Sequence, residues 1–128
     1  MTYQTREVDT PRKLKEFIRF PFRLYKGNPF WVPPMDFDEK LTLTKGKNPA
    51  LEFCELKMWM VYKENQPVGR IAGIINHKAN EIWGVRHARF GWIDFIDNQE
   101  VASILFNLVE TWARDRGMDA VHGPLGFT

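Results

Sequence analysis

The most distinct pattern of apolar and polar positions lies in the last third of the chain. Residues 88–97 are rich in aromatic and β-branched side chains, which favour a β-strand. Residues 98–116 predict an amphipathic helix, because their apolar positions form one stripe: Val101, Ile104, Leu105, Leu108 and Trp112. Gly117 is typical of the position after a helix end, and residues 119–121 begin another apolar run. The pattern predicts a strand, a helix and a second strand in that order.

The start of this helix carries its own local signal. Asp97 is an N-cap candidate, and Glu100 lies three residues later, so the pair predicts a capping box. Arg114 and Arg116 fall in the last turn, where cations interact favourably with the helix dipole.

The first quarter of the chain predicts a strand and a helix. Tyr3–Val8 alternates weakly and is interpreted as an edge strand. Asp9 and Thr10 are both good N-cap residues, and a helix over Pro11–Arg19 places its apolar side chains on one face. Pro21 is expected to end or kink this helix, with a further helical turn over Phe22–Lys26.

A long irregular region, residues 27–49, follows and is unusually apolar. Its aromatic and proline run, residues 30–34, has two interpretations. Either Phe30 and Trp31 hold the loop against the core, or the run lines a substrate or partner groove. Asp36–Leu43 predicts a short helix within this region.

The middle of the chain predicts an antiparallel meander. Residues 56–63 and 68–77 form a predicted hairpin, and residues 78–80 a turn. Residues 81–97 predict either a third, longer strand or a short strand followed by a long one. Four glycines interrupt these strands and mark expected bulges or close backbone approaches: Gly69, Gly73, Gly84 and Gly91.

Composition excludes several classes of function. The 128 residues carry 18 Lys and Arg against 16 Asp and Glu, and a net charge of +2 is too small to favour nucleic acid or an anionic membrane as a partner. No apolar run approaches the roughly 20 residues of a membrane helix, and the first residues do not read as a signal peptide. The only cysteine, Cys54, cannot form an internal disulfide and is interpreted as a core residue. The expected location is the cytoplasm.

Most catalytic motifs are absent from the sequence. The histidines at 77, 87 and 122 lack metal-ligand spacing, so no metal site is predicted. Ser103 is the only serine and lies mid-helix, which excludes serine hydrolase chemistry.

The order of predicted elements, together with several motifs, resembles the GNAT superfamily of acyltransferases. Thr111–Met118 is similar to the end of the central helix of that family, and Val68–Ile74 is similar to its third strand. Asn28–Pro34, Gly69–Ala72 and His122–Pro124 are also found in a longer bacterial group of GNAT-like proteins.

The resemblance implies an α+β fold in which residues 1–128 form a single, incomplete domain. The expected sheet is a partial, mixed one, mostly an antiparallel meander, with a central helix and a following strand. The C-terminal helix and two further strands of the family are missing, and so is its usual tyrosine acid. Acetyl-CoA or another acyl-CoA would lie between Arg89–Ile96 and Ala120–Gly123, and no metal is implied.

The expected cofactor loop departs from the family pattern. The residues that would meet the pyrophosphate through their backbone are Phe95, Ile96, Asp97, Asn98 and Gln99. Glycines usually allow such an approach, and none is present here. The carboxylates of Asp97 and Glu100 would also repel a phosphate.

Asp94 is the candidate catalytic residue. It lies near the end of the presumed fourth strand, where the family attacks the thioester, and a carboxylate there is suited to act as a general base. The alternative is a solvent-facing strand carboxylate, as is also the case for Glu81.

Two hypotheses about function follow. The first is an N-acyltransferase domain that transfers an acyl group to a small-molecule or peptide amine. The second is a non-catalytic binding or regulatory module on the same scaffold, for which self-association as a homodimer through an exposed strand edge is a further expectation.

Overall fold

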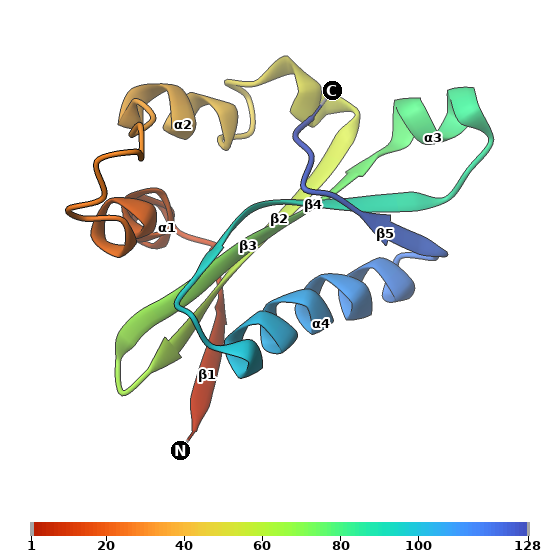
Figure 1. Cartoon of the computed structure of the whole chain (residues 1–128). Helices are drawn as coiled ribbons and strands as arrows, with labels where there is room; N and C mark the ends of the chain where they lie inside the picture. Colours follow the sequence, from red (N-terminus) through yellow and green to blue (C-terminus); the bar gives the residue numbers. More distant parts are fainter. Residues whose placement is uncertain (1, 128) are drawn as a thin grey trace.

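The computed structural model describes residues 2–127 and shows a five-stranded sheet with helices on both faces (Figure 1). The elements follow in the order β1 (Tyr3–Glu7), α1 (Pro11–Leu24), α2 (Asp36–Thr42), a short 3-10 helix (Pro49–Glu52), β2 (Cys54–Lys63), β3 (Gln66–Asn76), α3 (His77–Trp83), β4 (His87–Phe95), α4 (Gln99–Asp115) and β5 (Ala120–His122). The spatial order of the strands is the sequence order. Strands β1 to β4 are antiparallel neighbours, and β5 runs parallel to β4. The predicted α+β class and mixed sheet are confirmed.

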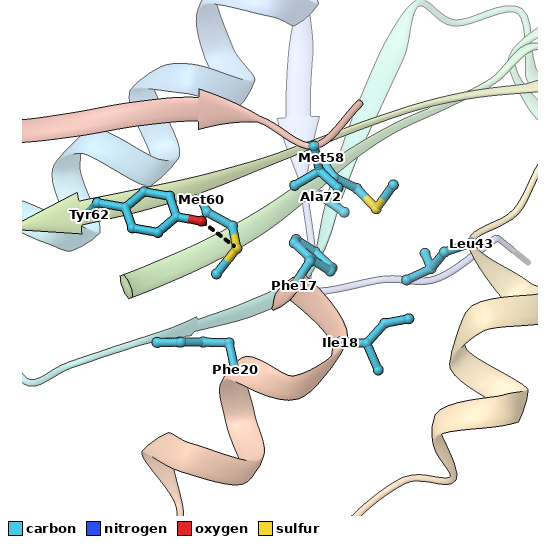
Figure 2. Close-up of a cluster of buried hydrophobic side chains, with 9 residues drawn as sticks. Phe17, Ile18, Phe20, Leu43, Met58, Met60, Tyr62 and Ala72 are labelled. Atoms are coloured by element: carbon cyan, nitrogen blue, oxygen red, sulfur yellow. Dashed lines mark hydrogen bonds between the residues drawn. The ribbon is translucent and has the colours of Figure 1, made fainter. Parts of the chain in front are cut away.

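The two faces of the sheet have separate cores. On one face, apolar side chains of β2 and β3 contact α1 and Leu43, as Figure 2 shows: Phe17, Ile18, Phe20, Leu43, Met58, Met60, Tyr62 and Ala72. On the other face, the alternate residues of the same strands contact α4: Trp59, Val61, Ile71, Val101, Leu105 and Val109. Because both faces are covered, β2 and β3 are almost continuously buried.

Helix α1 begins as predicted and does not end where predicted. The Thr10 hydroxyl accepts a hydrogen bond from the Lys13 amide at 3.2 Å, which confirms the N-cap. Of the two outcomes expected at Pro21, an end or a kink, the end is wrong, because the helix continues to Leu24, within the further turn predicted over residues 22–26. Proline has no N–H for the carbonyl of Phe17, four residues earlier. The Arg70 guanidinium donates to that carbonyl instead, with 2.8 Å between Nη1 and O.

Helix α4 occupies the predicted residues, but its cap is different. The Asn98 side chain accepts from the amides of Glu100 and Val101 at 2.9 and 3.2 Å, so Asn98 is the N-cap. The predicted capping box of Asp97 and Glu100 is therefore wrong by one residue. Gly117 follows the helix with φ of +80°, as predicted.

The predicted strand over residues 81–97 is wrong in its first part. Residues 77–83 form α3, which the Asn76 side chain caps by accepting from the Ala79 amide at 2.9 Å. Gly84 ends this helix in the left-handed region, with φ of +65°. Strand β4 therefore begins only at His87.

Helix α4 lies close against β3 because β3 offers glycines there. A Cβ atom at Gly69 would be 2.9 Å from Val101, and one at Gly73 would be 2.7 Å from Trp112. The predicted close approaches at these two glycines are confirmed.

Candidate functional site

The candidate site lies where β5 and β4 separate. The two strands pair over only three residue pairs, the last of which joins Arg89 to His122. Past this pair the chain turns at Gly123 and Pro124 and crosses β4, as the end of the ribbon in Figure 1 shows. The Leu125 amide then donates to the Phe90 carbonyl at 2.9 Å. Within residues 2–127, β4 beyond Arg89 has no β5 partner.

The crossing depends on two glycines. A Cβ atom at Gly91 would be 2.4 Å from the Leu125 carbonyl oxygen, and one at Gly123 would be 2.3 Å from the Phe90 carbonyl oxygen. Both neighbours are backbone, so neither position accepts a larger residue without displacing a chain segment. The same segments line a cavity of about 300 Å³: Gly91, Trp92, Pro124, Leu125 and Gly126.

A bulge in β4 lies beside this cavity. The register between β3 and β4 shifts between Arg70 and Ala72, and Trp92 opposite them has φ of +45°. A bulky residue in the left-handed region is rare and is held by its surroundings. The Trp92 indole N–H donates to the Glu39 carboxylate of α2 at 3.0 Å, and its ring lies 5.6 Å from that of Phe127. The bulge interrupts the β3–β4 register just past the last β4–β5 pair, and pairing with β3 resumes at Asp94.

Asp94 lies at the centre of a buried polar cluster under α1. Its Oδ2 accepts from Nε and Nη2 of Arg70 at 3.0 and 2.9 Å. Its Oδ1 accepts from the Tyr25 hydroxyl at 2.7 Å. The side chains of Arg70 and Asp94 are only 6% and 17% exposed, so Asp94 is not a solvent-facing strand carboxylate.

The cluster has a defined electrostatic character. The Arg70 guanidinium also lies over the Phe17 ring, 4.8 Å from its centroid, and therefore contacts both a carboxylate and an aromatic face. Burial, followed by the hydrogen bond to Asp94, raises the pKa of Tyr25 to about 12. Tyr25 is therefore a neutral hydrogen-bond donor at physiological pH.

The predicted cofactor residues lie between β4 and α4, and their amides are partly occupied. Ile96 donates to the Val68 carbonyl at 3.0 Å, and Asn98 donates to the Ile96 carbonyl at 2.7 Å. The first amides of α4 donate to the Asn98 side chain. Phe95 pairs with Gly69 in the sheet, while Asp97 and Gln99 are exposed. A phosphate at this helix start would have to replace the Asn98 side chain.

The remaining candidates lie apart from this site. Cys54 is buried, as predicted, and burial raises the pKa of its thiol. His77 pairs with Glu55 at 2.6 Å, whereas the His87 and His122 rings face each other at the start of β4, 5.4 Å apart. The part of the chain that the structure describes contains no group of three or more potential metal ligands. None of its helices is long and apolar enough to cross a membrane.

The fold places the chain in a known structural class. It matches an aminoglycoside acetyltransferase from an uncultured soil metagenomic sample, solved with sisomicin, with a TM-score of 0.61 and 13% identity over 96% of this chain and 78% of that one. A predicted acetyltransferase from Clostridium acetobutylicum, solved with acetyl-CoA, matches with a TM-score of 0.61 and 16% identity over 94% and 79%. The chain has a GNAT-like fold.

Sequence comparison adds two curated relatives. Protein YghO of Escherichia coli is 37% identical over 114 residues, which is 89% of this chain and 29% of that protein. Bacterial ceramide synthase of Caulobacter vibrioides is 31% identical over 122 residues, which is 94% of this chain and 32% of that protein. The chain thus spans about a third of the length of the curated relatives it matches. No family model matches it.

Arg70 and Tyr25 are the site residues that the sequence did not single out. Arg70 carried one local signal, since it is a charged residue inside an apolar strand, where a buried charge needs a partner. Tyr25 carried none, because it lies 69 residues before Asp94 in the chain.

Proposed function

We propose that the chain is the acyl-CoA-binding part of an N-acyltransferase that transfers an acyl group to an amine. The observation that carries the proposal is the separation of β4 from β5 beside the bulge at Trp92. Unpaired backbone groups of β4 at such a gap are suited to bind the pantetheine amides and to polarise a thioester carbonyl. The GNAT-like fold, and a neighbour solved with acetyl-CoA, support the choice of cofactor.

In this reaction a neutral amine attacks the thioester carbonyl, a C–N bond replaces the C–S bond, and CoA leaves as a thiolate that takes up a proton. The proton lost by nitrogen needs a base. We propose Asp94 for this role on the α1 side of β4. Oδ2 accepts twice from Arg70 and Oδ1 once from Tyr25, so Oδ1 retains an acceptor site for the amine proton. Arg70 and Tyr25 are then positioning residues.

The acceptor we propose is an amine of low molecular weight. The Caulobacter relative is named a ceramide synthase, and a ceramide is an N-acylated long-chain amino alcohol. The metagenomic neighbour was solved with the aminoglycoside sisomicin. A screen of both amine classes with acetyl-CoA and long-chain acyl-CoA, measuring release of free CoA thiol, distinguishes them. Asp94→Asn is expected to lower turnover of any active pair without lowering acyl-CoA affinity.

The first experiment is a thermal-shift titration with acetyl-CoA, with adenosine diphosphate as the control. Ligand at 100 times its dissociation constant adds about 2.7 kcal/mol to the free energy of unfolding. A saturable shift with acetyl-CoA, larger than that with adenosine diphosphate, supports the proposal. A full-length curated relative contains the residues that this chain does not cover. The absence of a thermal shift with acetyl-CoA in such a relative would refute the proposal.

A second candidate function is a non-catalytic binding or regulatory module. The observation in its favour is the start of α4, where the Asn98 side chain occupies the first amides and the Asp97 and Glu100 carboxylates are exposed. If these groups weaken acyl-CoA binding, Asp97→Asn with Glu100→Gln should raise the affinity. Glu110→Gln, an exposed carboxylate later in α4, is the matched control. Turnover of any acyl-CoA by the unmodified domain would exclude this function.

Two earlier expectations also remain proposals. β5 lies at an edge of the sheet with β4 as its neighbour, so a homodimer through its other side is a proposal that sedimentation tests. The cytoplasmic location is likewise proposed, and fractionation of the producing cell tests it.

A further inference from the structure

A groove between α1 and α2 lies outside the candidate site. It has a volume of about 650 Å³, and apolar side chains from both helices form its floor. The residues that line it are Pro11, Arg12, Leu14, Lys15, Ile18, Arg19, Asp36, Phe37 and Lys40. Figure 1 shows α1 and α2 on the face of the sheet opposite α4.

The charges around this groove are unbalanced. The two helices carry four acidic side chains, and three of them are engaged: Glu16 with the Tyr62 hydroxyl, Asp36 with Arg19, and Glu39 with the Trp92 indole. Of their six basic side chains, Lys13 pairs with Asp9 and Arg19 with Asp36, while Arg23 donates to the neutral side chain of Gln66. Arg12, Lys15 and Lys40 likewise have no acidic partner among residues 2–127, and these three line the groove. The groove therefore offers apolar surface beside uncompensated positive charge.

The loop between the two helices extends this surface. Trp31 is held against α1, with its ring 5.2 Å from that of Phe22 and 5.4 Å from that of Tyr25. Its neighbours Phe30 and Val32 are 91% and 84% exposed. Met35 and Phe37 are 68% and 67% exposed. Phe30 is thus not held on the core, as one interpretation of the sequence had it.

Such a combination is unusual for a surface that meets only water. Phe30, Val32, Met35 and Phe37 are four large, exposed apolar side chains within eight residues. On most protein surfaces that face water, exposed apolar side chains are scattered singly. Apolar side chains next to Lys and Arg are typical of protein surfaces that bind at a membrane interface. The net charge of +2 did not indicate this, because it sums over the chain and misses the local distribution.

We propose that the α1–α2 groove and the loop at residues 30–37 dock the domain onto an anionic lipid bilayer. Phe30, Val32, Met35 and Phe37 enter the interface, while Arg12, Lys15 and Lys40 meet the lipid phosphates. This inference goes beyond the proposed function, since it concerns where the domain acts and does not depend on acyl transfer.

Vesicle co-sedimentation tests the proposal without any activity readout. Vesicles of phosphatidylcholine alone are compared with vesicles of equal parts phosphatidylcholine and phosphatidylglycerol. Binding is expected only to the mixed vesicles and should weaken as salt is added. Each basic residue near an anionic surface contributes about fivefold in affinity, so Arg12→Gln, Lys15→Gln and Lys40→Gln together should weaken binding on the order of 100-fold.

The matched control is a set of three exposed cations elsewhere: Lys47→Gln, Lys78→Gln and Arg114→Gln. Both triple variants have the same net charge, so equal losses of binding would overturn the proposal. For the apolar contribution, Phe30→Ser with Val32→Ser is compared with Ile82→Ser and Trp83→Ser on α3, which are 70% and 77% exposed. Only the first pair should reduce binding.

Other occupants of the surface give distinct results. No preference of the unmodified domain for the mixed vesicles would overturn the proposal. So would a dimer in sedimentation that Phe30→Ser and Val32→Ser dissociate without changing vesicle binding, because the surface would then join two copies of the chain. Circular dichroism of every variant establishes that a loss of binding is not a loss of folding.

Discussion

Arg70 gives the most direct test of how the fold and the candidate site are connected. Its guanidinium binds Asp94 on β4 and also donates to the Phe17 carbonyl that Pro21 leaves without a helical partner. Arg70→Met removes both interactions from a residue that is 5% exposed. Breaking a buried ion pair by removing one partner costs about 3–5 kcal/mol, and the partial exposure of Asp94 favours the lower value. The midpoint temperature of thermal unfolding should then fall by roughly 10 °C.

The reasoning about Phe17 is tested by a second substitution. Pro21→Ala supplies an N–H that helical geometry directs at the Phe17 carbonyl. In the Arg70→Met background this new donor should restore about 1 kcal/mol more than it adds in the unmodified chain. The effects of Pro21→Ala on helix propensity and packing occur in both backgrounds and cancel in the double-mutant cycle. Urea denaturation of the four proteins measures the difference. Equal effects of Pro21→Ala in both backgrounds would refute the link between Pro21 and Arg70.

Three further predictions concern the site. Asn98→Ala should cost about 1 kcal/mol in urea denaturation as a lost cap, while Asp97→Ala costs less than about half of that, and the reverse order would contradict the assigned cap. Gly91→Ala should expose the amides of the tail after β5 to hydrogen exchange. Gly126→Ala should not, because a Cβ atom at Gly126 meets nothing within 4 Å. Equal protection of these amides in both variants would contradict the crossing of the tail over β4. The pKa of Tyr25 is raised from 10 to about 12, so its contribution to stability is present below pH 10 and is lost as the pH rises to 12. Tyr25→Phe should therefore lose less stability over that pH range in thermal melts, and parallel curves for the two proteins would refute the assignment.

The parts of the fold that the sequence predicted are those with strong local signals. Helix α4 has an apolar stripe over its whole length and a glycine after its end, and both are properties of neighbouring residues. The hairpin of β2 and β3 has a short turn between two apolar runs. These features do not depend on contacts far away in the sequence.

The wrong predictions have physical causes of two kinds. Helix α3 has only seven residues, and its Ile82 and Trp83 are exposed, so its apolar content resembled a strand. At α4, Asp97 and Asn98 are both good caps, and only the side-chain geometry decides between them. At Pro21 the freed carbonyl of Phe17 finds its partner, Arg70, 53 residues away in the sequence, and no local pattern carries such information.

Some residues of the candidate site were proposed from the sequence, and their partners were not. Asp94 was identified from its place near the end of a strand, but its partners Arg70 and Tyr25 come from β3 and from the residue after α1. The segment at residues 95–99 was predicted to be a cofactor loop from the resemblance to the GNAT family and stays a prediction, and the Asn98 cap that occupies amides at this helix start was not foreseen.

The hydrogen bonds along β4 and its junction with α4 indicate where affinity for an acyl-CoA would come from. Beyond Arg89 the strand has no β5 partner, and the tail after β5 covers it at Phe90 and Gly91, so the backbone from Trp92 onward is the part that could serve a ligand. At the start of α4 the Asn98 side chain already serves the helix amides, so a phosphate there gains only the difference between two sets of hydrogen bonds. The exposed carboxylates of Asp97 and Glu100 reduce that gain further. An acyltransferase built in this way would bind its cofactor mainly through the pantetheine and acyl group, and a pantetheine thioester that lacks the pyrophosphate should compete with acetyl-CoA at similar concentrations.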